Sequence, residues 1–115
     1  MHSARYQSIA TDLEYAAASA RSRQEVVLIY KHSTLCELCA AAKDQLLSLT
    51  AEGDPPVYEV IVQTARPLSN MIARTLGIRH ESPQAILLQN EKPVFDTSHR
   101  GVTARGVRAA IRRLS

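Results

Sequence analysis

The chain has 115 residues, 45% of them hydrophobic, which is enough for one folded domain over residues 1–115 around a single core. Its net charge of +3 and its low aromatic content of 4% do not favour a nucleic-acid-binding protein, although arginines gather near the C-terminus. An apolar run of about 18 residues, as a membrane span requires, is absent from the sequence. The N-terminal residues lack the apolar core of a signal peptide, so we expect a cytoplasmic protein without a membrane partner.

The first predicted helix covers residues 11–23. Thr11 is a favourable N-cap, and Glu14 three residues later completes a capping box. The apolar spacing predicts a buried stripe formed by Leu13, Ala16, Ala17 and Ala20. The apolar run at residues 25–31 then predicts a buried strand, and residues 6–8 are a candidate for a further short strand.

Helices and strands alternate in the middle of the chain. A helical pattern over residues 36–50 ends before the Gly-Asp-Pro-Pro segment at 53–56, and residues 57–62 form the next predicted strand. Pro67 suits the first turn of a helix, and Gly77 suits the position just past its end. We therefore expect a helix between these two residues.

The last part of the chain predicts a hairpin and a helix. Residues 85–88 and 93–95 form strands around a short turn, and residues 103–114 form a helix capped by Thr103. Alternating strands and helices imply parallel pairs, to which the hairpin adds an antiparallel pair. The element order predicts an α/β thioredoxin fold, with a four- to five-stranded mixed sheet flanked by helices.

The only two cysteines, Cys36 and Cys39, lie where the first predicted strand meets the second predicted helix. Unpaired backbone N–H groups at a helix start carry partial positive charge and favour a thiolate. Cys39 lies about one turn later on the same face and is expected to be more buried. The pair therefore predicts an attacking thiol, Cys36, and a resolving thiol, Cys39, beyond the carboxyl end of a strand, where ligands bind in open α/β sheets.

Three other interpretations of the cysteine pair are open. A zinc site would need two more ligands from His32, His80 and His99, whose spacing fits no compact finger. A structural disulfide would close a very short loop and remove little chain entropy. The two thiols could also be inert core residues. Redox chemistry explains their position at a strand-to-helix junction better, and we predict no metal.

Several motifs resemble known proteins. Residues 76–78 followed by Ser82-Pro83 resemble the passage of thioredoxin folds in which a helix ends and a cis-proline enters the next strand. More specifically, the chain resembles the YtxJ-like bacilliredoxins of the bacillithiol system, on four segments: residues 31–34, 66–70, 80–84 and 98–99. The resemblance extends over residues 8–111, nearly the whole chain.

The resemblance implies an activity. Bacilliredoxins reduce mixed disulfides between protein cysteines and the low-molecular-weight thiol bacillithiol, so the implied partners are bacillithiolated proteins, with bacillithiol as co-substrate and no cofactor. The chain departs from the family pattern, in which Pro, an apolar residue and Ser follow the reactive cysteine, because it has Glu37, Leu38 and Cys39. Both a monothiol and a dithiol mechanism are therefore open.

The same resemblance suggests further contacts. Ser82 and Pro83 would offer a backbone edge to the substrate, and His99 with Arg100 would lie near the small thiol's carboxylates, unless that segment is an ordinary exposed loop. His32, next to Lys31, could favour the Cys36 thiolate electrostatically. Two other functions are alternatives: a general dithiol protein disulfide reductase, and a redox-silent interaction module.

Overall fold

The computed structural model describes residues 5–114, which fold around a five-stranded mixed sheet in the order β1-β3-β2-β4-β5. The strands are β1 (Tyr6–Ser8), β2 (Val27–His32), β3 (Val57–Ile61), β4 (Gln84–Gln89) and β5 (Lys92–Ser98). Strands β1 and β2 both run parallel to β3, whereas β4 is antiparallel to β2 and β5. The predicted mixed sheet is confirmed, with residues 6–8 as its fifth strand.

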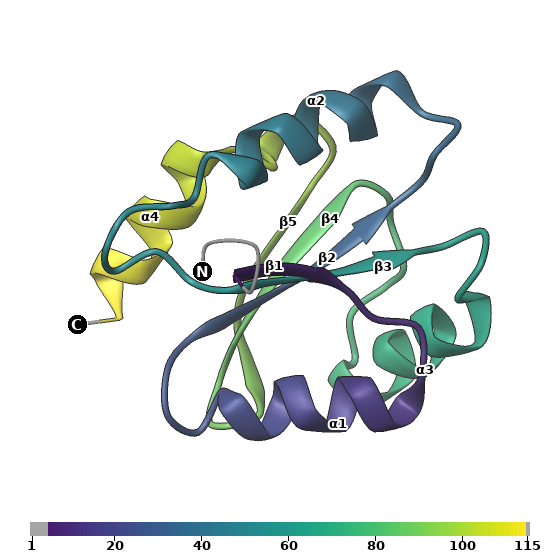
Figure 1. The fold of residues 1–115 in the computed structure, drawn as a ribbon, viewed down its shortest axis with the longest axis horizontal. Helices are drawn as coiled ribbons and strands as arrows, with labels where there is room; N and C mark the ends of the chain where they lie inside the picture. The colour runs from purple at the N-terminus through teal and green to yellow at the C-terminus, as the bar shows by residue number, and fades with distance from the viewer. Residues whose placement is uncertain (1–4, 115) are drawn as a thin grey trace.

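Helices cover both faces of the sheet (Figure 1). The helices are α1 (Asp12–Arg21), α2 (Glu37–Leu47), α3 (Arg66–Leu76) and α4 (Ala104–Arg113), and a 3-10 turn, η2 (His99–Gly101), joins β5 to α4. Buried side chains of α1 and α3 form one core cluster with the sheet, and those of α2 and α4 form the other. Among residues 5–114, no helix is both long enough and apolar enough to cross a membrane.

Strand β2 contributes to both cores because successive side chains of a strand point to opposite faces. Val27 and Ile29 belong to the α1/α3 cluster, whereas Leu28 and Tyr30 belong to the α2/α4 cluster. All six residues of the strand are buried. A strand covered on both faces needs a continuous apolar run, which is the signal that predicted it.

Helix α1 begins as predicted but buries a different face. Thr11 is the N-cap, and its capping box with Glu14 is complete. The predicted buried stripe is wrong, because the buried residues are Tyr15, Ala18 and Ser19, while Leu13 is 84% exposed. Residues two apart on a helix lie about 200° apart around its axis, so Leu13 and Tyr15 cannot both face the core. The larger Tyr15 ring takes that place.

The carboxyl end of β2 and the start of β4 lie together because the two strands are antiparallel neighbours. Lys31 pairs with Gln84 in this register. The loop that follows β2 leads to Cys36, and the residue before Gln84 is Pro83. The pairing therefore brings the predicted cysteine site and the predicted proline loop to one edge of the sheet.

Candidate active site

Cys36 is the N-cap residue of α2 and is partly exposed. Its backbone is extended, with φ of −124° and ψ of 120°, and its Sγ accepts a hydrogen bond of 3.2 Å from the backbone N–H of Cys39. The sulfur thus occupies the place that a serine or aspartate oxygen takes in an ordinary N-cap. The prediction that Cys36 lies at a helix N-terminus is confirmed.

The two thiols have opposite pKa shifts. The pKa of Cys36 is lowered, first by a hydrogen bond from the Cys39 side chain and then by the backbone N–H groups of Cys39 and Leu38, against smaller opposing effects of desolvation and of the Glu37 charge. Burial raises the pKa of Cys39 to about 11. Cys36 is therefore the thiol that ionises first, and Cys39 stays protonated beneath it.

The Ser82–Pro83 peptide bond is cis, in agreement with the sequence resemblance. The loop is connected to the η2 turn, since the Pro83 carbonyl accepts a hydrogen bond of 2.9 Å from the His99 backbone N–H. The side chains add a second link, because His99 Nε2 lies 3.0 Å from Glu81 Oε1. His99 is thereby held by the proline loop on both its backbone and its ring.

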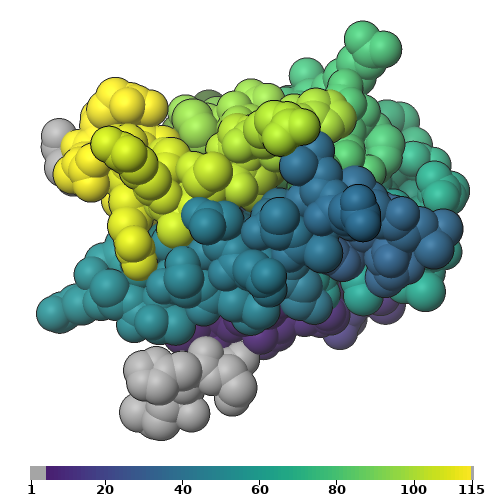
Figure 2. Space-filling view, turned by 90° about the horizontal axis from the view of Figure 1, so that it is seen from above, coloured from purple at the N-terminus to yellow at the C-terminus, as the bar shows by residue number. Residues whose placement is uncertain are grey.

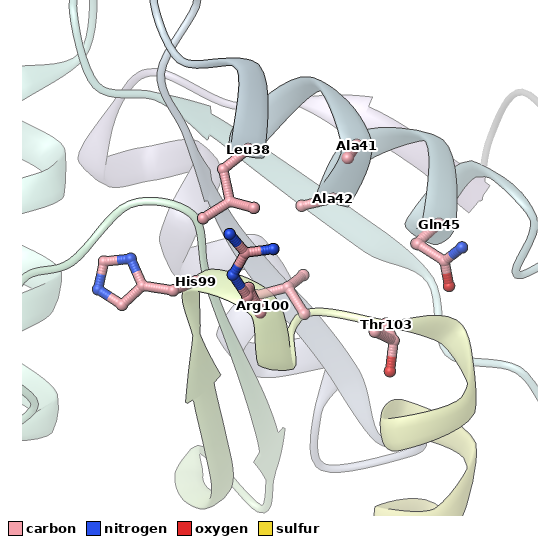
Figure 3. A pocket seen from close by; sticks show the side chains of 8 residues that line it. Leu38, Ala41, Ala42, Gln45, His99, Arg100 and Thr103 are labelled. Atoms are coloured by element: carbon pink, nitrogen blue, oxygen red, sulfur yellow. The ribbon is translucent and has the colours of Figure 1, made fainter.

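A groove of about 290 Å³ lies between α2 and the segment from η2 to α4. Its lining residues are Leu38, Ala41, Ala42, Gln45, His99, Arg100, Val102 and Thr103. Figure 2 shows these two segments side by side on the surface. In Figure 3 the Arg100 guanidinium lies over the groove, between Leu38 and Ala42. The groove thus combines apolar side chains of α2 with the guanidinium group of Arg100.

The family model described as monothiol bacilliredoxin BrxC matches residues 7–107. The chain belongs to the bacilliredoxin family. This membership supports a thiol redox role, which agrees with the opposite pKa shifts of the two cysteines.

Solved structures support the same fold. One protein described as having a thioredoxin fold is 28% identical to this bacilliredoxin, with a TM-score of 0.85 over 95% of this chain and 96% of the other. A thioredoxin of Malassezia sympodialis has a TM-score of 0.72 at 20% identity, over 94% and 89% of the two chains. A thioredoxin of Schistosoma mansoni has a TM-score of 0.74 at 17% identity, over 96% and 98%. The bacilliredoxin therefore has the thioredoxin fold that its element order predicted.

His32 lies deeper than the sequence suggested. Its side chain is 7% exposed, and its Nδ1 is 2.8 Å from the hydroxyl of Tyr30, which in turn donates a 2.9 Å hydrogen bond to the Cys39 carbonyl. Burial lowers the pKa of His32, which keeps the ring neutral near pH 7. His32 is therefore linked to the cysteines through Tyr30. Because its ring is neutral, it does not stabilise the Cys36 thiolate through a positive charge, as the sequence had suggested.

Lys31 points to the opposite face of the sheet. Its ammonium group is fully buried and donates to the Ser69 carbonyl at 2.9 Å and to His80 Nδ1 at 3.2 Å. Burial lowers the pKa of Lys31 to about 8. The interactions that lower the pKa of Cys36 come from the first turn of α2. Lys31 is not one of the groups that lower this pKa, in contrast to the electrostatic role suggested from the sequence.

Three residues of the site had no signal in the sequence. Leu38 and Gln45 line the groove from α2, and the Gln45 side chain also accepts a hydrogen bond of 3.1 Å from the Ala104 backbone N–H. Tyr30 lies in an apolar run, where a tyrosine is usually a core residue. The roles of Leu38 and Gln45 depend on the η2–α4 segment, which is distant in sequence, and that of Tyr30 depends on how α2 packs over β2. Within residues 5–114, no group of three or more His, Cys, Asp or Glu side chains could hold a metal ion.

Proposed function

We propose that this bacilliredoxin reduces mixed disulfides between bacillithiol and protein cysteines, with Cys36 as attacking thiol and Cys39 as resolving thiol. One observation carries the proposal: in a bacilliredoxin chain, an N-cap thiol with a lowered pKa lies above a buried thiol with a raised one. Bacillithiol is a co-substrate in this scheme, and the reaction requires no bound cofactor.

In the first step, the Cys36 thiolate attacks the bacillithiol sulfur of the mixed disulfide. A new Cys36–bacillithiol disulfide forms, the old disulfide breaks, and the target protein leaves as a thiolate that takes a proton from water. The lowered pKa of Cys36 provides the attacking thiolate near neutral pH. The partial charges of the helix start and the N–H of Cys39 stabilise it until it reacts.

In the second step, Cys39 loses its proton and attacks Cys36 Sγ. A Cys36–Cys39 disulfide forms, and bacillithiol leaves as a thiolate that accepts the released proton. A separate thiol reductant then supplies two electrons to restore both thiols. Burial, and to a lesser extent the neighbouring Cys36 thiolate, raise the pKa of Cys39 and keep it protonated before the first step. The first step removes the contribution of that thiolate, because Cys36 is then part of a neutral disulfide.

The groove provides room for the bacillithiol moiety. Leu38 follows the nucleophile by two residues and forms part of the groove wall, and Arg100 offers a guanidinium to a carboxylate. Next to the groove, the Ser82–Pro83 loop would present its backbone to the target protein, as expected for a docked extended peptide. The two binding regions adjoin each other at His99, which lines the groove and is hydrogen-bonded to the loop.

The test uses three purified proteins: wild type, Cys36→Ser and Cys39→Ser. With a bacillithiolated protein as substrate, Cys36→Ser should be inactive, and Cys39→Ser should release the target once and keep one bacillithiol on Cys36, visible by mass spectrometry. Substrates carrying cysteamine or glutathione in place of bacillithiol serve as controls for specificity. Bacillithiol trapped on Cys39 in the Cys36→Ser variant would reverse the assigned roles.

A general dithiol reductase is the second candidate, and the presence of Cys39 in a family described as monothiol favours it. Such an enzyme would reduce an intramolecular protein disulfide, such as those of insulin, as fast as a bacillithiol mixed disulfide. Equal rates on both substrates would support this candidate over the bacillithiol-specific one.

A further inference from the structure

We propose that Tyr30 is a positioning residue for the thiol pair: its hydroxyl, held by His32, fixes the first turn of α2 through the carbonyl of Cys39. The inference rests on the proposed function only in taking Cys36 and Cys39 as the reacting thiols. It assigns no contact between Tyr30 and the substrate.

The hydroxyl of Tyr30 is not needed to fill the core, and it forms two hydrogen bonds there. Tyr30 is fully buried in the core cluster under α2 and α4, where a phenylalanine ring would fill the same space. Burying a hydroxyl is unfavourable unless it is hydrogen-bonded. Here it has two partners, the Cys39 carbonyl at 2.9 Å and His32 Nδ1 at 2.8 Å. Both distances are within the normal range.

The direction of these bonds follows from the number of protons. A phenol has one proton and a carbonyl has none, so the Tyr30 proton goes to the Cys39 carbonyl. The bond to His32 then needs a proton from the ring, which makes His32 the neutral tautomer with hydrogen on Nδ1. His32 thus holds the hydroxyl oxygen while the hydroxyl proton points to Cys39.

This arrangement reaches Cys36 because Cys39 is fixed on both of its peptide groups. Its carbonyl accepts from Tyr30, and its N–H donates to Cys36 Sγ at 3.2 Å. The Cys39 side chain also donates to Cys36, which is the main cause of the lowered Cys36 pKa. A first turn that is free to move would hold these donors less well on the thiolate. Removing the Tyr30 hydroxyl should therefore raise the pKa of Cys36.

The experiment measures the pH dependence of Cys36 alkylation in Tyr30→Phe and in the matched control Tyr58→Phe. Tyr58 is also buried, but it lies on the other face of the sheet, where its hydroxyl accepts from Arg21 at 3.0 Å. We expect the apparent pKa of Cys36 to rise by at least about half a unit in Tyr30→Phe, which is about a threefold loss of thiolate at pH values well below that pKa. Tyr58→Phe should keep the wild-type profile. Equal profiles for both variants would overturn the proposal.

His32 gives an independent test that does not depend on the folding of Tyr30→Phe. His32→Asn keeps an N–H group near the position of Nδ1 and should retain the wild-type Cys36 pKa, whereas His32→Leu should raise it. Equal pKa values in these two variants would contradict the pairing. Alkylation needs no bacillithiol, so a wild-type protein that fails to turn over bacillithiol substrates would refute the proposed function without affecting this result.

Discussion

At the scale of single residues, the reactivity of the site depends on two cysteines one helical turn apart that meet different surroundings. Cys36 is partly exposed and faces backbone donors, whereas Cys39 is buried beneath it. The first environment favours a thiolate and the second favours a thiol. Two identical side chains therefore acquire a fixed order of reaction.

A substitution at Cys39 tests which interaction lowers the Cys36 pKa. The largest cause is the hydrogen bond from the Cys39 side chain, so Cys39→Ala should raise the pKa of Cys36. Cys39→Ser retains a side-chain donor and should keep more of the lowering. Alkylation rates of the single remaining cysteine, measured against pH, give both values. A Cys36 pKa that is the same in Cys39→Ala and wild type would leave the backbone N–H groups as the main cause.

At the scale of elements, the termini of helices decide where the site residues lie. Helix α2 starts at the nucleophile because Cys36 itself is the cap. Helix α3 has Pro67 in its first turn and ends at Gly77, whose φ of 67° is in the left-handed region. The chain then runs through a short loop to the cis Ser82–Pro83 bond. The end of α3 thus sets where the proline loop begins.

Gly77 allows a test of this helix end. A Cβ at this position would meet nothing within 4 Å, so the cost of Gly77→Ala comes from the backbone conformation alone. We expect a loss of about 1 kcal/mol in the free energy of unfolding, and a smaller loss for Gly77→Asn, because asparagine tolerates the left-handed region. Chemical denaturation of both variants measures this difference. An alanine variant as stable as wild type would show that the helix end relaxes.

At the scale of the whole molecule, the two faces of the sheet each enclose a charged group near the site. On the α2 face, the buried Glu59 accepts hydrogen bonds from the Tyr6 hydroxyl at 2.8 Å and the Ser8 hydroxyl at 3.0 Å, and these two bonds attach β1 to the sheet. Glu59 also forms an ion pair with Lys43 at 3.2 Å. On the α3 face, Lys31 bonds only neutral groups, Ser69 and His80. Glu59 has a charged partner and Lys31 does not, so we expect the protonation of Lys31 to influence how the free energy of unfolding changes with pH.

The buried Lys31 should add a stabilising contribution that grows as the pH rises through mild alkali. Its pKa is lowered from 10.5 to about 8 in the folded state, so between these values the unfolded chain binds more protons. The contribution of Lys31 to the free energy of unfolding therefore rises with pH in that window, on the order of 3 kcal/mol for a fully buried amine, while the raised pKa of Cys39 contributes a fall above about pH 9. Lys31→Met should lack this rise, and Lys92→Met, on exposed β5, should keep it. Denaturation curves at pH values on both sides of the window measure the slopes. The same slope in Lys31→Met and wild type would contradict the prediction.

Much of the fold could be predicted from the sequence because its signals are local. The Thr11 and Glu14 capping box, the Gly77 helix end and the continuous apolar run of β2 each depend on residues within one or two turns. The position of Cys36 at a helix start is of the same kind. Such signals act through backbone geometry and nearest neighbours, so the chain determines them without help from distant segments.

Only the tertiary structure decides which side chains face one another. Leu13 and Tyr15 compete for the same core, and the sheet surface that meets α1 selects Tyr15. His32 and Lys31 are adjacent in sequence, yet the pleat of β2 sends one toward α2 and the other toward α3. Arg100 reaches the groove because η2 packs beside α2. These outcomes depend on burial against remote segments, which a local pattern of residues does not contain.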